Sequence, residues 1–181
     1  SIAGTSSNGI GIYAESTSGM TVNNTGTIDV QGNDSRGIYV KGVGIKTIIN
    51  TGTVKTGNSS DVLKPGVGIY SENAGDIITN NGTVEAGVSS VGIYSKSGTV
   101  TQNGQVKAGS NGTGIYVDGG TVNLNLGSSL ETGANNGVGV YALNGANIVN
   151  NGATTIGDGS YGYALKSGAN LINNTAATLG D

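Results

Sequence analysis

The chain has 181 residues, of which 35 are glycine, and it contains no cysteine and no histidine. Its formal net charge at pH 7 is −3, and charged residues make up only 10% of it. The lack of cysteine excludes disulfides and thiolate metal sites, and the weak acidic balance disfavours nucleic-acid binding, which requires clustered lysine and arginine. No apolar run approaches the roughly 18 residues of a membrane-spanning helix, so we do not expect the chain to span a membrane.

A short motif, Gly-Ile-Tyr or a close variant, recurs along the whole chain. Its tyrosines are spaced by 25 residues on average. A repeat of this length indicates a solenoid, in which each turn buries its apolar face by stacking on its neighbours. The seven tyrosines that mark the copies are Tyr13, Tyr39, Tyr70, Tyr94, Tyr116, Tyr141 and Tyr163.

Each copy contains three short segments that are rich in β-branched residues and bounded by glycine, which is typical of β-strands. In the fourth copy they are 90–95, 99–104 and 105–109. Residues two apart in a strand share a face. In the first copy we therefore expect Ile10, Ile12 and Ala14 to point inward, and the tyrosine and glycine of the motif to point outward.

The second segment of six copies ends in an amide, two residues after an apolar residue. We expect these amides to lie inside a corner of the coil and to hydrogen-bond from turn to turn, as asparagine ladders do in cross-β stacks. They are Asn24, Asn50, Asn80, Gln102, Asn150 and Asn173.

The third segment carries a charge whose sign alternates from copy to copy. Turns stacked in register lie about 4.8 Å apart. At that spacing opposite charges attract by roughly 0.2–1 kcal/mol per pair. The alternation therefore predicts parallel, in-register stacking of consecutive copies, and not a row of separate hairpins. The charged residues are Asp29, Lys55, Glu85, Lys107 and Glu131.

Together these patterns predict an all-β fold, a parallel β-helix with three strands per rung and about seven rungs of about 25 residues over 1–181. The general preference for right-handed crossovers predicts a right-handed coil. Both ends fall in the same phase of the repeat and lack a polar cap, so we expect a single solenoid segment that is an internal fragment of a longer protein.

Length differences between copies single out two loops, a long one between Lys55 and Tyr70 and a shorter one between Lys41 and Lys46. Variable loops on a uniform scaffold are common binding sites, although a neutral surface insertion accounts for the same pattern. The candidate partner-binding residues of the long loop are Ser59, Ser60, Asp61, Val62, Leu63 and Lys64.

The tyrosine column is a second candidate surface for a partner, since aligned aromatic residues are enriched at interfaces. Its candidates are Tyr70, Tyr94 and Tyr116. The alternative is that each tyrosine only covers the glycine of a neighbouring copy and shields the sheet.

The sequence predicts no catalytic residue, no metal site and no cofactor. Glycoside cleavage requires two acids about 5–10 Å apart in a cleft, whereas lysines separate Asp29, Glu85 and Glu131 along their column. Calcium-binding solenoids repeat G-G-x-G-x-D about every nine residues, and this pattern does not recur. We therefore do not expect an enzyme.

Written out as a repeat, the chain resembles the passenger region of bacterial autotransporters (type V secretion), in particular large fusobacterial adhesins of the RadD type. The motifs that carry the resemblance are 80–84, Asn-Asn-Gly-Thr-Val, and 92–95, Gly-Ile-Tyr-Ser, in their recurrent forms. The resemblance implies a right-handed β-helix at the bacterial cell surface that adheres to a protein or glycan of host cells or other bacteria. It also implies an export signal and an outer-membrane barrel, both outside this sequence. A polysaccharide-active enzyme and a self-association module, pairing through open edges or tyrosine faces, stay open as alternatives.

Overall fold

The computed structural model describes residues 1–61 and 63–180, which form twenty-two strands and no helix. Sheet A contains β1 (Ile2–Gly4), β4 (Thr27–Val30), β7 (Thr53–Thr56), β10 (Thr83–Ala86), β13 (Gln105–Ala108), β16 (Ser129–Thr132), β19 (Ala153–Ile156) and β22 (Ala177–Leu179). Sheet B contains β2 (Ile10–Glu15), β5 (Arg36–Lys41), β8 (Val67–Ser71), β11 (Val91–Lys96), β14 (Thr113–Asp118), β17 (Val138–Leu143) and β20 (Tyr161–Leu165). Sheet C contains β3 (Met20–Asn24), β6 (Lys46–Asn50), β9 (Ile77–Asn80), β12 (Thr99–Gln102), β15 (Thr121–Leu124), β18 (Asn147–Asn150) and β21 (Asn170–Asn173).

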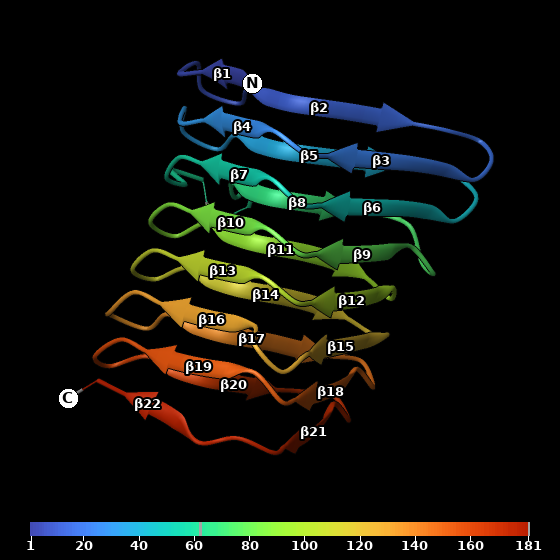
Figure 1. The fold of residues 1–181 in the computed structure, drawn as a ribbon. Helices are drawn as coiled ribbons and strands as arrows, with labels where there is room; N and C mark the ends of the chain where they lie inside the picture. The colour runs from blue at the N-terminus through green and yellow to red at the C-terminus, as the bar shows by residue number, and fades with distance from the viewer. Residues whose placement is uncertain (62, 181) are drawn as a thin grey trace.

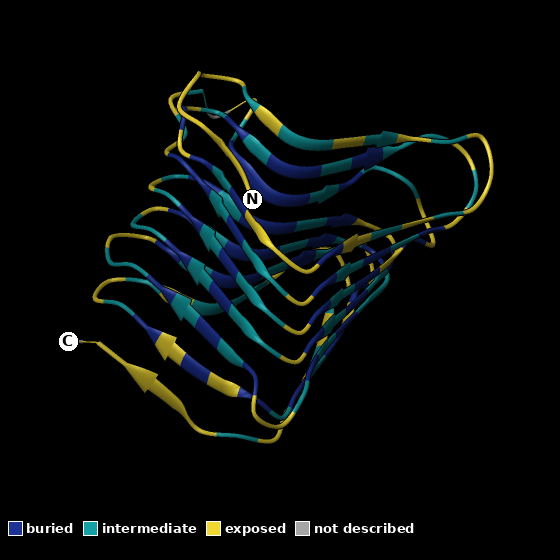
Figure 2. Ribbon diagram, turned by 45° about the horizontal axis from the view of Figure 1, so that its top comes forward, coloured by how far each residue is buried: buried dark blue, intermediate teal, exposed yellow. Residues whose placement is uncertain are grey.

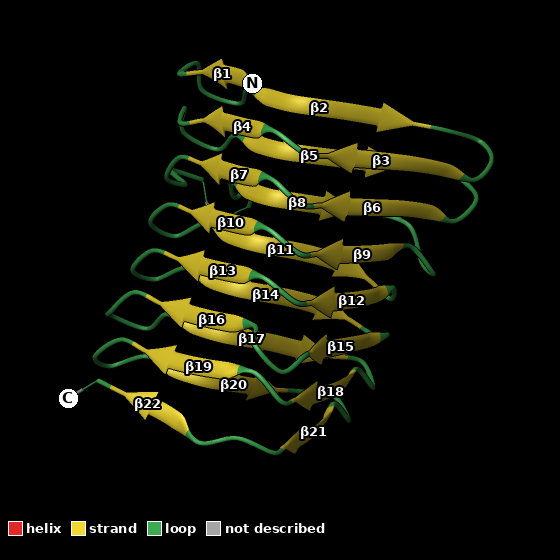
Figure 3. Ribbon diagram, viewed as in Figure 1, coloured by secondary structure: helices red, strands yellow, loops and turns green. Residues whose placement is uncertain are grey.

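The chain visits sheets B, C and A in order, so that β2, β3 and β4 form the first turn and β20, β21 and β22 the seventh (Figure 1). Consecutive turns stack along one axis, with the two termini at opposite ends of the rod (Figure 3). The pairings among the described strands are parallel, for example between β10 and β13. The predicted parallel β-helix with three strands per turn is thus confirmed.

Equivalent residues of neighbouring turns lie opposite one another whatever their separation in the chain. Val54 pairs with Val84, and Val84 pairs with Val106, although 30 and 22 residues separate them. Loops at the corners absorb this difference in length. The charged residues of the third segment also pair as predicted, from Asp29 with Lys55 through to Lys107 with Glu131.

The interior of the coil is a column of aliphatic side chains to which each sheet contributes. Figure 2 shows the buried residues recurring along the stacked strands. In the third turn Ile69, Ile78 and Val84 are fully buried, one from each sheet. Each such side chain stabilises the fold by about 1.5–3 kcal/mol relative to exposure. The exposed residues gather in the corner loops and on the two end turns (Figure 2).

The glycine of the repeated motif faces the interior, which corrects the prediction that it points outward. A Cβ atom on Gly68 would lie 2.5 Å from Val84 Cγ1 and 2.5 Å from the carbonyl oxygen of Gly92 in the next turn, so only glycine fits. The residue before the glycine turns outward instead, and the guanidinium of Arg36 accordingly lies among the outer tyrosines. Ile10 pairs with Arg36 and shares this outer position, contrary to prediction.

Tyr163 does not continue the tyrosine column, contrary to prediction. It pairs with Val140, while Ala164 pairs with Tyr141. Tyr163 therefore packs against the core. Its hydroxyl lies 3.1 Å from Oγ1 of Thr154, a position that the larger Leu130 occupies in the preceding turn. The smaller polar side chain thus gives Tyr163 both room and a hydrogen-bond partner.

The corner amides form the predicted ladder between sheets C and A. Asn24 donates to Asn50 at 2.8 Å, Asn50 to Asn80 at 2.7 Å, and Asn80 to Gln102 at 2.9 Å. Leu124 occupies the next position and interrupts the ladder. Among the described residues, Nε2 of Gln102 consequently has no hydrogen-bond partner. The ladder resumes between the last two corner amides at 2.8 Å.

Replacing Asn50 by alanine removes two hydrogen bonds of this ladder. Asn24 and Asn80 then each lose a buried partner, so we expect the free energy of unfolding to fall by about 1–3 kcal/mol, measured by urea unfolding. Asn103 is the matched control, because on the exposed surface it likewise makes two bonds between turns: it donates to Asn81 and accepts from Asn125, both at 2.7 Å. Asn103→Ala should change stability by less than about 0.5 kcal/mol. Equal losses of unfolding free energy in both variants would show that the buried amides stabilise the fold no more than the exposed ones.

Gly68→Ala tests the inward orientation of the motif glycine. The added methyl group overlaps Val84 and the backbone of the next turn, so the free energy of unfolding should fall by about 1–3 kcal/mol. Gly162 is the equivalent position in the last turn, where an added Cβ would meet only Ile156 at 3.7 Å. Gly162→Ala should therefore be nearly neutral in the same urea titration, and a loss as large as that of Gly68→Ala would contradict the crowding argument.

Candidate functional site

The base of the long loop, 57–66, is tied to neighbouring turns by its serines. Ser59 Oγ lies 2.9 Å from Ser90 Oγ and accepts a hydrogen bond from the backbone of Gly66 at 2.7 Å. The backbone N–H of Ser60 donates to Asp34 Oδ1 at 2.7 Å, and its hydroxyl donates to the other carboxylate oxygen. The hydroxyl of Ser60 holds the pKa of the Asp34 carboxyl below its ordinary value. The fold thus uses both serines that were predicted to bind a partner.

The tip of the loop is what it presents to solvent. Leu63 is 86% exposed, and Lys64 is also exposed. Asp61 is half-buried and accepts a hydrogen bond from the backbone of Leu63 at 2.8 Å. Val62 lies outside the described residues. Of the residues predicted in this loop, Leu63 and Lys64 are thus exposed at its tip.

The smaller loop, 41–46, is held by a buried lysine that the sequence did not suggest. The Lys46 side chain is fully buried, and its ammonium donates to the carbonyl oxygens of Val43 at 2.8 Å and Gly44 at 2.7 Å. Its backbone N–H donates to Oδ1 of the buried Asp76 at 2.8 Å. These bonds fix a tip on which Val43 is 71% and Ile45 56% exposed. The signal available in the sequence was the length of the loop alone.

The predicted tyrosine column lies on the outer face of sheet B. The rings of Tyr70, Tyr94, Tyr116 and Tyr141 are stacked, with centroid separations of 4.6, 5.1 and 5.3 Å and interplanar angles of 16, 13 and 3°. The two preceding tyrosines meet their neighbours edge to face. Because Tyr94 and Tyr116 are covered on both faces, a sugar ring cannot stack on them. Only their ring edges and hydroxyls are left for contact with other molecules.

A second column of alternating charge runs beside the tyrosines, where the sequence-based prediction had none. Its members lie two residues after each tyrosine, a count that would have found it. In the structure Glu15 pairs with Lys41, and Lys96 pairs with Asp118. Glu72 directly follows β8, which pairs in register with β5 and β11. Each turn has the same sign in this column as in the column on sheet A. The residues are Glu15, Lys41, Glu72, Lys96 and Asp118.

Charges and phenols interact closely on this face. Lys41 Nζ lies 3.7 Å from Glu15 Oε2, and the Tyr39 hydroxyl donates to Glu72 Oε1 at 2.6 Å. Burial, followed by the hydrogen bond to Glu72, raises the pKa of Tyr39. Burial, followed by the neighbouring tyrosines, raises the pKa of Tyr94 to about 12. These two phenols therefore stay protonated at neutral pH.

In the column on sheet A, each lysine pairs with the acid of the following turn. Lys55 Nζ lies 2.8 Å from Glu85 Oε2, and Lys107 Nζ lies 3.5 Å from Glu131 Oε2. Asp29 instead accepts a hydrogen bond from the side chain of Gln31 at 2.7 Å. The charged groups are exposed, so each ion pair contributes about 0–1 kcal/mol. They favour the same in-register stacking that the backbone hydrogen bonds impose.

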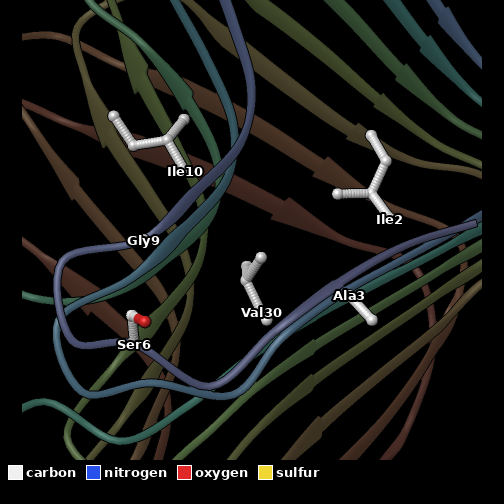
Figure 4. Close-up of a pocket in the computed structure, with 7 residues that line it drawn as sticks. Ile2, Ala3, Ser6, Gly9, Ile10 and Val30 are labelled. Carbon is white, nitrogen blue, oxygen red and sulfur yellow. The ribbon is translucent and has the colours of Figure 1, made fainter.

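The remaining features offer little chemistry. The hollow in Figure 4, at the N-terminal end of the coil, is lined by aliphatic and small side chains without a charged group. Within 1–61 and 63–180, no group of three or more acidic residues is placed to hold a metal ion. The same residues include no helix long and apolar enough to cross a membrane.

Comparison with models of known protein families, with curated proteins and with solved structures gives no match for this chain. The surfaces described above are therefore interpreted from their own geometry.

Glu72→Gln tests the electrostatics of the tyrosine face. Removing this carboxylate should lower the pKa of Tyr39 toward its ordinary value, although burial continues to raise it. Ultraviolet absorbance during an alkaline titration measures the shift. Glu131→Gln removes the same charge from the other column and should leave the tyrosines unchanged. If both variants titrate identically, Glu72 does not contribute to the raised pKa of Tyr39.

The same burial makes stability depend on alkaline pH. A tyrosine in the unfolded chain has a pKa of about 10, whereas burial raises the pKa of Tyr94 in the folded chain to about 12. Above about pH 10 the folded state therefore binds more protons than the unfolded state, and stability should fall as pH rises from about 10 to about 12. Urea midpoints measured across this interval check the expectation, and a constant midpoint would contradict it.

Proposed function

We propose that this chain is a segment of a surface-displayed adhesin of the autotransporter passenger type, which carries partner-binding loops on a rigid rod. The observation that supports the proposal most directly is the long loop 57–66. Its base is bonded to neighbouring turns through Ser59 and Ser60, and its tip exposes Leu63 and Lys64. A loop ordered at its base loses less conformational entropy on binding, which favours affinity.

The partner in this proposal is a protein or glycan on host cells or other bacteria. An exposed leucine next to a lysine suits a surface with an apolar depression bordered by acidic groups. Binding is favoured over glycan cleavage because Asp29, Glu85 and Glu131 alternate with lysines along their column, which neutralise them. The absence of cysteine is compatible with export of the unfolded chain through a narrow pore.

A double variant, Leu63→Ser with Lys64→Glu, tests the role of the loop tip. Purified rods labelled with a fluorophore are incubated with epithelial and bacterial cells, and binding is measured by flow cytometry. We expect at least about a tenfold weaker binding, because the variant removes both exposed anchors.

Leu126→Ser is the matched control for this experiment. Leu126 is 89% exposed but lies at another corner of the rod, in the fifth turn. This variant should bind as the unchanged chain does. Undiminished binding by a correctly folded double variant would exclude the loop as the adhesive element.

A further inference from the structure

The stacked tyrosines on sheet B are arranged as adjacent phenols that an oxidant can couple. We propose that Tyr70, Tyr94, Tyr116 and Tyr141 form a site of oxidative modification, at which neighbouring rings become joined as dityrosine within one chain. The principal cross-link joins Tyr94 to Tyr116 and fastens the fourth turn of the rod to the fifth.

The backbone holds the reacting rings together before any oxidation occurs. Tyr94 pairs in register with Tyr70 on one side and with Tyr116 on the other. The ring centroids are 4.6 and 5.1 Å apart, and the ring planes are inclined by only 16 and 13°. Preorganised groups of this kind react with each other far faster than with a second molecule in dilute solution. Coupling within the chain therefore precedes coupling between chains.

Hydrogen peroxide together with a haem peroxidase is the oxidant in this proposal. Each of two phenols loses one electron and its hydroxyl proton, which gives two tyrosyl radicals. A carbon–carbon bond forms between their ortho carbons, and the hydrogen on each ortho carbon moves to the phenol oxygen. The peroxide takes up the two electrons and two protons, so that two tyrosines and one peroxide give one dityrosine and two water molecules.

Neighbouring cations decide which pair reacts first. The guanidinium of Arg36 lies 4.9 Å from the ring centroid of Tyr39 and 5.1 Å from that of Tyr70. Lys166 Nζ lies 5.4 Å from the ring centroid of Tyr141. A positive charge over a ring opposes the removal of an electron from it. Within 1–61 and 63–180, no such contact occurs at Tyr94 or Tyr116, which makes this central pair the preferred site.

The test is oxidation of the whole chain at low concentration with hydrogen peroxide and a haem peroxidase. Dityrosine fluorescence should appear in the monomeric fraction, and peptide mapping should find the peptides of Tyr94 and Tyr116 joined more often than any other pair. The variant Tyr94→Phe with Tyr141→Phe keeps the ring packing but leaves no stacked pair of tyrosines. We expect it to lose most of the fluorescence while its circular dichroism is unchanged.

Tyr161→Phe tests whether dityrosine forms because tyrosines are stacked or because they are exposed. Tyr161 is 57% exposed, more than any tyrosine of the column, but it pairs with Val138 and, within 1–61 and 63–180, stacks on no other tyrosine. This variant should give the same yield as the unchanged chain. The proposal is overturned if dityrosine occurs only in covalent dimers, or if the yield depends on Tyr161 and not on Tyr94 and Tyr141.

Discussion

Parallel hydrogen bonding between successive turns is the interaction on which the rest of the molecule depends. At the corner between sheets C and A, for example, the backbone of Gly52 donates to Asn24 and that of Gly82 donates to Asn50, at 3.1 and 3.0 Å. Such bonds place each residue over its equivalents in the neighbouring turns, about 4.8 Å away. Any property that recurs in the sequence therefore becomes a continuous column in space. The aliphatic core, the amide ladder, the stacked phenols and the two charge columns all arise in this way.

The fold and its register could be predicted because the corner amide gives a fixed origin for counting. From that origin the charges of sheet A fall at a nearly constant distance, and their alternation is meaningful only if turns stack in parallel. Counting in the same way from the tyrosines would also have found the second charge column. Counting from the tyrosine gave the wrong orientation for Tyr163. In the last turn the glycine of the motif stays in register with the preceding turn, whereas the tyrosine lies one residue too early to join the column.

In the strands of sheet B, the inward and outward residues do not alternate strictly at the glycine of the motif. Gly68 and Ile69 are adjacent, yet both are buried, and the glycine faces Val84 across the coil. The period of two assumes a regular pleat, and a glycine pressed against the opposite strand departs from it. Nothing in the spacing of the residues alone reveals that close approach.

The candidate binding loop shows a different limit of sequence reasoning. Its length marked it as unusual, but its serines bond to Asp34 and Ser90, which belong to the preceding and the following turn. Contacts between residues so far apart in the chain become visible only once the turns are stacked. Lys46 shows a local limit instead, because the carbonyl oxygens that hold its ammonium belong to its own loop, and the path of that loop cannot be read from residue spacing.

The paired charge columns also bear on how such a rod can change its length. Because the sign reverses at every step, deleting the second, third or fourth turn brings like charges together on two faces at once. Deleting two consecutive turns restores the original sequence of signs. Duplication or loss within this region therefore disturbs the charge columns least when it involves two turns at a time.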